Sequence, residues 1–170
     1  MNIKIEGLTE LAGLLEKLKL IPQGEAVRQA LLDGAGLITT AARANAPIAA
    51  YPTHYRGRMI APGGLRKSLM AAPGKSYKNF LQAYAFTLRR MAPHAHLVEF
   101  GTKPHVITSK KGKMLRFGRG LKIFEKKKVN HPGSRENPFF RKAIRSQRNA
   151  VKRLLESKVK QAFDALGRTA

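Results

Sequence analysis

The residues best suited to bind a metal ion lie in one short segment, residues 92–102, which reads APHAHLVEFGT. It contains His94, His96 and Glu99, and zinc accepts imidazole nitrogens and carboxylate oxygens as ligands. In a β-strand His94 and His96 would lie on the same face, because alternate side chains point the same way. Pairs of histidines beside proline are also common without any metal, so we expect neither a metal site nor a cofactor here.

The patterns of known catalytic sites are missing from the chain. It has no cysteine, no G-x-S-x-G elbow, no phosphate-binding P-loop and no H-E-x-x-H sequence. Only five acids follow residue 50, which leaves few carboxylates for an acid–base pair or for the metal site of a nuclease. Ser68 and Ser134 have no identifiable catalytic partner. We therefore expect a protein that is not an enzyme.

The net charge of +23 is extreme for 170 residues, and it is unevenly distributed. Residues 1–50 hold five bases and five acids, whereas residues 51–170 hold the remaining 28 bases and only five acids. Copies with such a surface repel one another unless the charge faces a polyanion, an acidic partner or the outside of an assembly. The alternative explanation is that the basic surface serves only to keep the protein soluble.

The start of the chain, MNIKIEG, alternates apolar and polar residues and lacks the apolar core and cleavage site of a secretory signal. No apolar run approaches the roughly 20 residues needed to cross a bilayer. The lack of cysteine fits folding in a reducing compartment. We therefore expect a soluble protein that is made in the cytoplasm and has no membrane partner.

The first third of the chain has helical periodicity. After a short expected strand at residues 1–7, leucines recur at three- and four-residue spacing over residues 8–21 and predict an amphipathic helix. A second helix is predicted over Gln23–Ala46, where many small residues would let another element approach closely. Residues 48–63 are rich in proline and glycine and are expected to form a long exposed loop.

The rest of the chain predicts strands followed by a long helix. Residues 75–90 suit a strand with apolar groups on both faces, and residues 104–109 and 113–117 predict a hairpin around a Lys-Lys-Gly tip. The final helix is predicted over residues 138–167, with proline at its start. This order of elements predicts a single α+β domain over residues 1–170, with amphipathic helices packed on a small antiparallel sheet.

Residues 104–130 are expected to form a basic hairpin arm, in which residues 121–124 add a further strand. The cations of this arm include Lys110, Lys111, Lys113, Arg116, Lys126, Lys127 and Lys128. Such charge, with phenylalanine between the bases, also suits sequence-independent binding of nucleic acid that weakens steeply as salt rises. Nucleic-acid binding is therefore the alternative to a purely structural role.

Three segments together resemble one family of phage proteins. They are ANAP at 44–47 followed by GLRKSL at 64–69, APHAHLVEFGT at 92–102, and HPG at 131–133 followed by NPFFRKAI at 137–144. In this order they are similar to the motifs of the tail-component proteins of lambdoid and related siphoviruses, which are akin in role to tail-completion proteins and minor tail protein Z. The chain departs from the family pattern in its longer loop at 48–63 and in His94, where tyrosine is common.

The resemblance implies a structural protein of the virion, made and assembled in the cytoplasm of the bacterial host. It implies a homo-oligomeric ring at the head-tail junction or the head-proximal end of the tail, in contact with connector, stopper, tail-terminator or tail-tube proteins. The basic residues of such a ring would face either DNA in its lumen or an acidic neighbouring ring. Besides the arm, the expected interaction residues are Arg66, Glu99, Phe100, Gly101, Pro138, Phe139 and Phe140.

Glu99 is one of the few acids in the basic part of the chain. An ion pair with Arg66, or with a base of a neighbouring subunit, would serve assembly, whereas a pair inside one subunit would be structural. The structural pair is favoured, because buried carboxylates are normally paired locally and lose several kcal/mol without their partner. Gly101 is expected to allow a backbone turn that a side chain would hinder.

Overall fold

The computed structural model describes residues 24–55, 58–75, 81–109, 114–119 and 122–167. The expected N-terminal strand and first helix lie outside these residues. The chain divides into two compact units, one formed by the residues up to Pro93 together with those from Phe139 onward, and the other by His94–Pro138. Helices and antiparallel strand pairs are both present, so the α+β class predicted from the sequence is confirmed.

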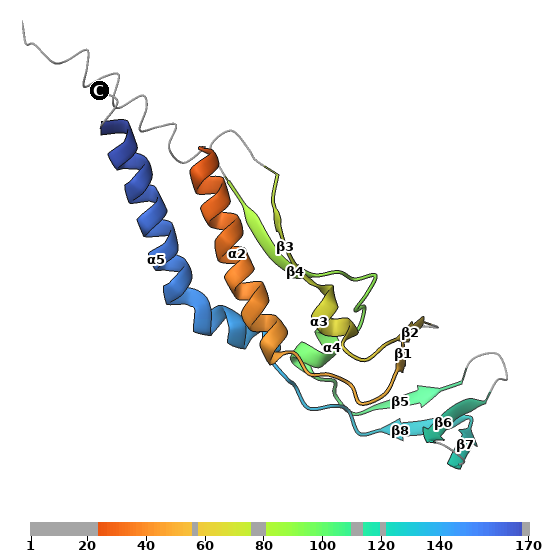
Figure 1. The fold of residues 1–170 in the computed structure, drawn as a ribbon. Coiled ribbons are helices and arrows are strands. Elements are labelled where there is room, and N and C mark those ends of the chain that lie inside the picture. The colour runs from red at the N-terminus through yellow and green to blue at the C-terminus, as the bar shows by residue number, and fades with distance from the viewer. Residues whose placement is uncertain (1–23, 56–57, 76–80, 110–113, 120–121, 168–170) are drawn as a thin grey trace, which may run out of the picture. The chain divides into compact units, whose positions relative to one another are not determined.

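Two long helices, α2 (Glu25–Asn45) and α5 (Phe139–Gly167), pack along each other in the first unit (Figure 1). They confirm the two helices predicted at these positions. Small residues make the buried face of α2, namely Ala30, Gly34, Ala35, Thr39 and Ala42. A methyl group at Gly34 would lie 3.1 Å from Cγ1 of Val151 on α5, so the lack of a side chain at Gly34 lets the two helices approach closely.

Alanine substitutions at Gly34 and Gly36 should therefore have different effects on stability. Both positions lie inside α2, where alanine favours the helix over glycine by about 0.5–1 kcal/mol. Gly36 has no neighbouring atom within 4 Å of an added methyl group, so Gly36→Ala should raise the free energy of unfolding. Gly34→Ala should lose this gain, because the methyl group crowds Val151. Urea unfolding of both variants measures the difference, and equal effects would contradict close packing at Gly34.

Strands β3 (Leu69–Pro73) and β4 (Ala83–Thr87) form an antiparallel pair that contacts α2 (Figure 1). The register runs from Leu69 opposite Thr87 to Pro73 opposite Ala83. The strand predicted over residues 75–90 is therefore too long at both ends, because residues 75, 81–82 and 88–90 lie outside β4. After Thr87 the chain turns, because the amides of Met91 and Ala92 both donate to the carbonyl of Leu88.

The segment expected as a long loop contains a short hairpin. Strand β1 (Thr53–Tyr55) pairs antiparallel with β2 (Arg58–Ile60), and the short helix α3 (Gly64–Ser68) follows. Thr, Tyr and Ile favour strands, and this preference outweighs the proline and glycine around them. Ile60 is buried at the end of the hairpin, so the hairpin has an apolar contact that a free loop would lack.

The described residues of the second unit form one short helix and four strands. These are α4 (Ala95–Phe100), β5 (His105–Thr108), β6 (Leu115–Arg119), β7 (Lys122–Lys126) and β8 (Lys128–His131). The expected further strand is confirmed as β7. The hairpin predicted between 104–109 and 113–117 is wrong, because β5 pairs with β8 and β6 pairs with β7. Fewer residues separate β6 from β7 than separate β5 from β6. Pairing β6 with β7 therefore costs less chain entropy for closing the loop between them.

Two glycines hold the base of the β5–β8 ribbon together. Gly101 has φ +68° and Gly133 has φ +86°, a region that other residues adopt only with strain. Between them Thr102 and Ser134 form an isolated antiparallel bridge, with both backbone N–H···O distances at 3.0 Å. The backbone turn expected at Gly101 is therefore confirmed, and Gly133 has the same function on the opposite segment.

Candidate interaction surface

Arg66, an expected interaction residue, connects α3 to the C-terminal end of α2. Its Nε donates to the carbonyl of Ala46 at 2.8 Å, and its Nη2 lies 3.5 Å from the carbonyl of Ala44. These carbonyls lack partners inside the helix and carry partial negative charge, so a cation stabilises them. Arg66 and Glu99 belong to different units, and an ion pair between them stays the untested alternative to a structural pair of Glu99.

The other residues of the GLRKSL motif are mostly buried. Leu65 and Leu69 are in the core, and the buried hydroxyl of Ser68 donates to the carbonyl of Leu65 at 2.7 Å. Ser68 is therefore a satisfied structural residue. Lys67 is exposed, so within this motif it is a side chain that a partner can reach.

A first depression, which we call the Arg43 hollow, lies beside α3 and is lined by Arg43, Ala44, Arg66 and Lys67, with a volume of about 470 Å³. Nη2 of Arg43 donates to the carbonyl of Leu69 at 2.5 Å, and Arg66 is bound to α2 as described above. Two of its three cations thus hold backbone carbonyls. The hollow is basic, but most of its charge serves the fold.

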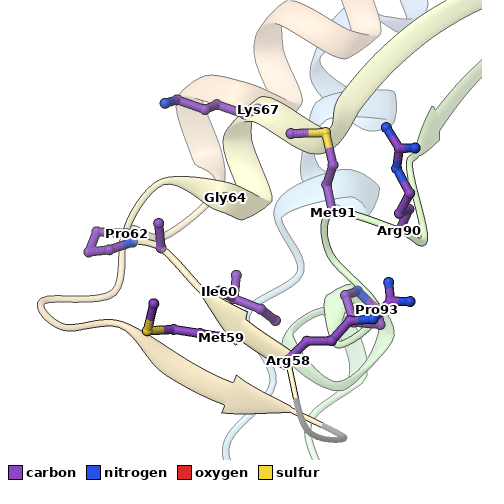
Figure 2. Close-up of a pocket in the computed structure, with 10 residues that line it drawn as sticks. Arg58, Met59, Ile60, Pro62, Gly64, Lys67, Arg90, Met91 and Pro93 are labelled. Atoms are coloured by element: carbon purple, nitrogen blue, oxygen red, sulfur yellow. The ribbon is translucent and has the colours of Figure 1, made fainter.

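A second depression, which we call the Ile60 hollow, lies between the β1–β2 hairpin, α3 and the turn after β4, with a volume of about 240 Å³ (Figure 2). Its apolar lining includes Met59, Ile60 and Met91. Three cations, Arg58, Lys67 and Arg90, line it as well. Lys67 is shared with the Arg43 hollow, so the two depressions form one basic surface around α3.

The long helix α5 has a row of exposed cations. Arg141, Arg145, Arg148 and Lys152 are exposed and are spaced four, three and four residues apart, which places them on one face over about 16 Å. Lys152 pairs with Glu156 at 3.7 Å, one turn further along. Like charges at this spacing destabilise an isolated helix slightly, so the row suits a negatively charged neighbour.

In the second unit the expected interaction residues Glu99 and Phe100 lie at the end of α4. Glu99 is 6% exposed, whereas the next residue, Phe100, is 65% exposed. A carboxylate buried to this extent is not a free surface group, so Glu99 belongs to the interior of the protein. Phe100 is the member of the pair that presents an apolar side chain on the surface.

His94 and His96 are not in a strand. His94 is the N-cap of α4 and His96 lies in its first turn, so the same-face arrangement expected for a strand does not occur. Burial lowers the pKa of His94, and the nearby His96 lowers it further. Within the described ranges, no group of three or more His, Cys, Asp or Glu side chains is placed to hold a metal ion.

The basic arm is described in part. Lys110, Lys111 and Lys113 lie outside the described residues. Arg116 pairs with Glu125 across the β6–β7 ribbon at 2.9 Å, so one of the cations of the basic arm is neutralised. Lys126, Lys127 and Lys128 are all exposed, where β7 passes into β8. We call these three residues the lysine triplet.

The C-terminal motif begins the long helix. Pro138 precedes α5, and Phe139 is its first residue, 1% exposed. Phe140 meets Phe139 edge to face, with 6.3 Å between ring centroids. Phe139 therefore anchors α5 in the core and is not available to a partner.

None of the residues that line the Ile60 hollow was among the interaction residues expected from the sequence. Met59 and Ile60 fall in the segment expected as a loop, and Met91 falls just after the expected strand. Their side chains line the same cavity only because the hairpin, α3 and the turn after β4 fold together. In the sequence, the one indication of this site was that a basic residue stands directly before each of the two methionines.

No family model, curated protein or solved structure matches this chain. Among the helices of the described residues, none combines the length and the apolar character needed to cross a bilayer.

Proposed function

We propose that this protein is a structural subunit of a tailed phage, which oligomerises as a ring at the head-tail junction or the head-proximal end of the tail and completes the tail or joins it to the head. Its work is binding without catalytic turnover. The observation that carries the proposal is the make-up of the second unit, whose described strands pair as two-stranded ribbons with apolar side chains on their surface.

Two-stranded ribbons bury little and are marginally stable in water on their own. Every residue of β5 is exposed, with Val106 at 51% and Ile107 at 38%, and Phe124 of β7 is 53% exposed. Neighbouring copies in a ring would cover these exposed side chains and add apolar contacts to the ribbons. This supports an assembling protein, because apolar surface in contact with water favours association.

The three segments that resemble the phage family lie at positions that determine the fold. GLRKSL forms α3 and starts β3, VEFGT ends α4 at the Gly101 turn, and NPFF starts α5. Residues of this kind are expected to recur among proteins that share a fold, whatever their surfaces bind. The motifs therefore support the family, while the exposed residues between them would select the partners.

The proposal is tested by removing the protein from a phage that encodes it. Such a phage should accumulate filled heads and tails that fail to join, and the wild-type chain supplied from a plasmid should restore joined particles. Electron microscopy of lysates gives the count of each species. Normal numbers of joined, infectious particles without the protein would overturn the proposal.

A second candidate function, sequence-independent binding of nucleic acid, is favoured by the lysine triplet and the α5 row of cations. Charge reversal of the triplet (K126E, K127E and K128E together) should weaken duplex DNA binding. It should also reduce the slope of log affinity against log salt by roughly 3, since each phosphate that a lysine neutralises adds about 0.9 to that slope. Fluorescence anisotropy with a labelled 20-base-pair duplex measures both quantities.

The matched control reverses three exposed cations outside the arm, K75E, R89E and K103E, so that the net charge changes equally. It should keep most of the affinity and the slope. Equal losses in both triple variants would mean that only net charge attracts DNA. If the triplet variant binds DNA normally while phage without the protein accumulate unjoined heads and tails, DNA contact through this arm is incidental.

A further inference from the structure

The Ile60 hollow combines an apolar centre with a cationic edge. In Figure 2, Ile60 lies near the middle of the hollow, with Lys67, Arg90 and Arg58 at separate points around it. Met59 is 69% exposed and Met91 is 36% exposed, while Ile60 is 8% exposed. A ligand would therefore contact the flexible, accessible side chains of Met59 and Met91 first and the buried side chain of Ile60 beneath them.

The cations at the edge are available to a ligand. None of the residues that line the hollow is acidic. Among the described residues, no acidic side chain forms an ion pair with Arg58, Lys67 or Arg90. Three unneutralised cations around one opening favour a partner with several carboxylates, and the guanidinium groups suit bidentate pairing with them.

The backbone around α3 fixes the depth of the hollow. Gly63 has φ +76°, and a methyl group on Gly64 would lie 2.9 Å from Cγ2 of Ile60. The chain thus passes tightly over Ile60 and leaves a cavity of about 240 Å³. Sites for drug-sized molecules usually hold roughly 300–1,000 Å³, so this hollow suits an inserted side chain better than a cofactor.

We propose that the Ile60 hollow is a docking site for an acidic peptide segment of a partner protein, which inserts one apolar side chain against Ile60, Met59 and Met91 and places its carboxylates on Arg58, Lys67 and Arg90. Nucleic acid would satisfy the cations, but its phosphates would leave the methionines without an apolar partner. The inference rests on the proposed function in taking the occupant to be another protein of the assembly.

Methyl NMR of the full chain labelled at methionine tests the site directly. Met59 and Met91 line the hollow, whereas Met70 and Met114 lie elsewhere and serve as internal controls. The probe is the synthetic peptide DDELFDED, and the matched peptide DDESSDED has the same charge without the apolar anchor. DDELFDED should shift the methyl signals of Met59 and Met91 and leave those of Met70 and Met114 in place, and DDESSDED should bind at least about tenfold more weakly.

Charge reversal supplies the second readout. Arg90→Glu should weaken DDELFDED binding by roughly tenfold or more, because it removes a charged partner and adds repulsion. Arg89→Glu is the matched control, since Arg89 is exposed and adjacent in sequence but does not line the hollow. It should change the affinity by less than about twofold. Thermal unfolding of both variants checks that the fold is kept.

Several outcomes would overturn the docking site. They are absence of binding, shifts spread equally over Met59, Met91, Met70 and Met114, equal affinity for the two peptides, or equal effects of the two charge reversals. A 20-base-pair duplex is the competitor. If it displaces the peptide, shifts the methyl signals of Met59 and Met91 and binds with an affinity similar to that of the peptide, the hollow is a general polyanion site instead. The peptide experiment and the count of joined phage particles are independent measurements. If the peptide does not bind, the proposed function is still decided by the particle count, so the two can fail separately.

Discussion

Phe139→Ala should lower the free energy of unfolding by about 3–5 kcal/mol. Phe139 is the largest side chain that is fully buried among the described residues, at 1% exposed, and it is the first residue of α5. Ala143, one turn later, is completely buried, so the first turn of α5 has little room to collapse into the space that the ring leaves. The loss therefore includes both the transfer of the ring to water and a residual cavity.

The matched control is Phe163→Ala on the same helix, where the ring is 45% exposed. This variant should lose less than about 1.5 kcal/mol, because much of the ring already contacts water. Urea unfolding monitored by circular dichroism gives both values, provided that the slope against urea stays constant. A loss at Phe139 no larger than that at Phe163 would contradict its place as the anchor of α5.

Gly133→Ala should disrupt the base of the second unit, with a loss of at least about 2 kcal/mol in local stability. The residue has φ +86°, and an added methyl carbon would lie 2.3 Å from the carbonyl oxygen of Thr102. Both the strained backbone and this contact with main-chain atoms oppose the native conformation. The Thr102–Ser134 bridge must shift to make room.

Hydrogen exchange of single backbone amides measures this loss of local stability at the base of the second unit. The amides of Thr102 and Ser134 donate to each other's carbonyls, so their protection should fall by roughly 30-fold, the equivalent of about 2 kcal/mol. The amide of Ala46, which donates to Ala42 in the first unit, should keep its protection. Ser134→Ala is the mild control, because it removes only an exposed side-chain contact. Unchanged exchange at Thr102 and Ser134 would contradict the structural role of Gly133.

The two long helices could be predicted from the sequence because their signals are local, whereas the short helices α3 and α4 were not predicted. Apolar side chains at three- and four-residue spacing predicted α2 and α5, and Pro138 fixed the start of α5 to within one residue. Pairing of strands is not local in the same sense. Nothing in HVIT at residues 105–108 states that its partner is KVNH at 128–131, so the nearer segment was predicted instead.

The candidate sites were predictable in part, for a related reason. Residue type and motif identified Arg66, Glu99 and Phe139, but not which of them the fold would bury. Phe139 anchors the core, whereas Arg66, from another of the three motif segments, holds backbone carbonyls. The Ile60 hollow escaped prediction because its residues come from separate segments that meet only in the folded chain.

The central claim, that this protein works by assembling with copies of itself and with neck or tail proteins, is tested most directly by sedimentation and electron microscopy. The full chain should be measured at high concentration and physiological salt, alone and with the connector and tail-tube proteins of a phage that encodes it. A closed ring, formed alone or on these partners, is the predicted result. A stable monomer that forms no ring even in their presence would contradict the claim.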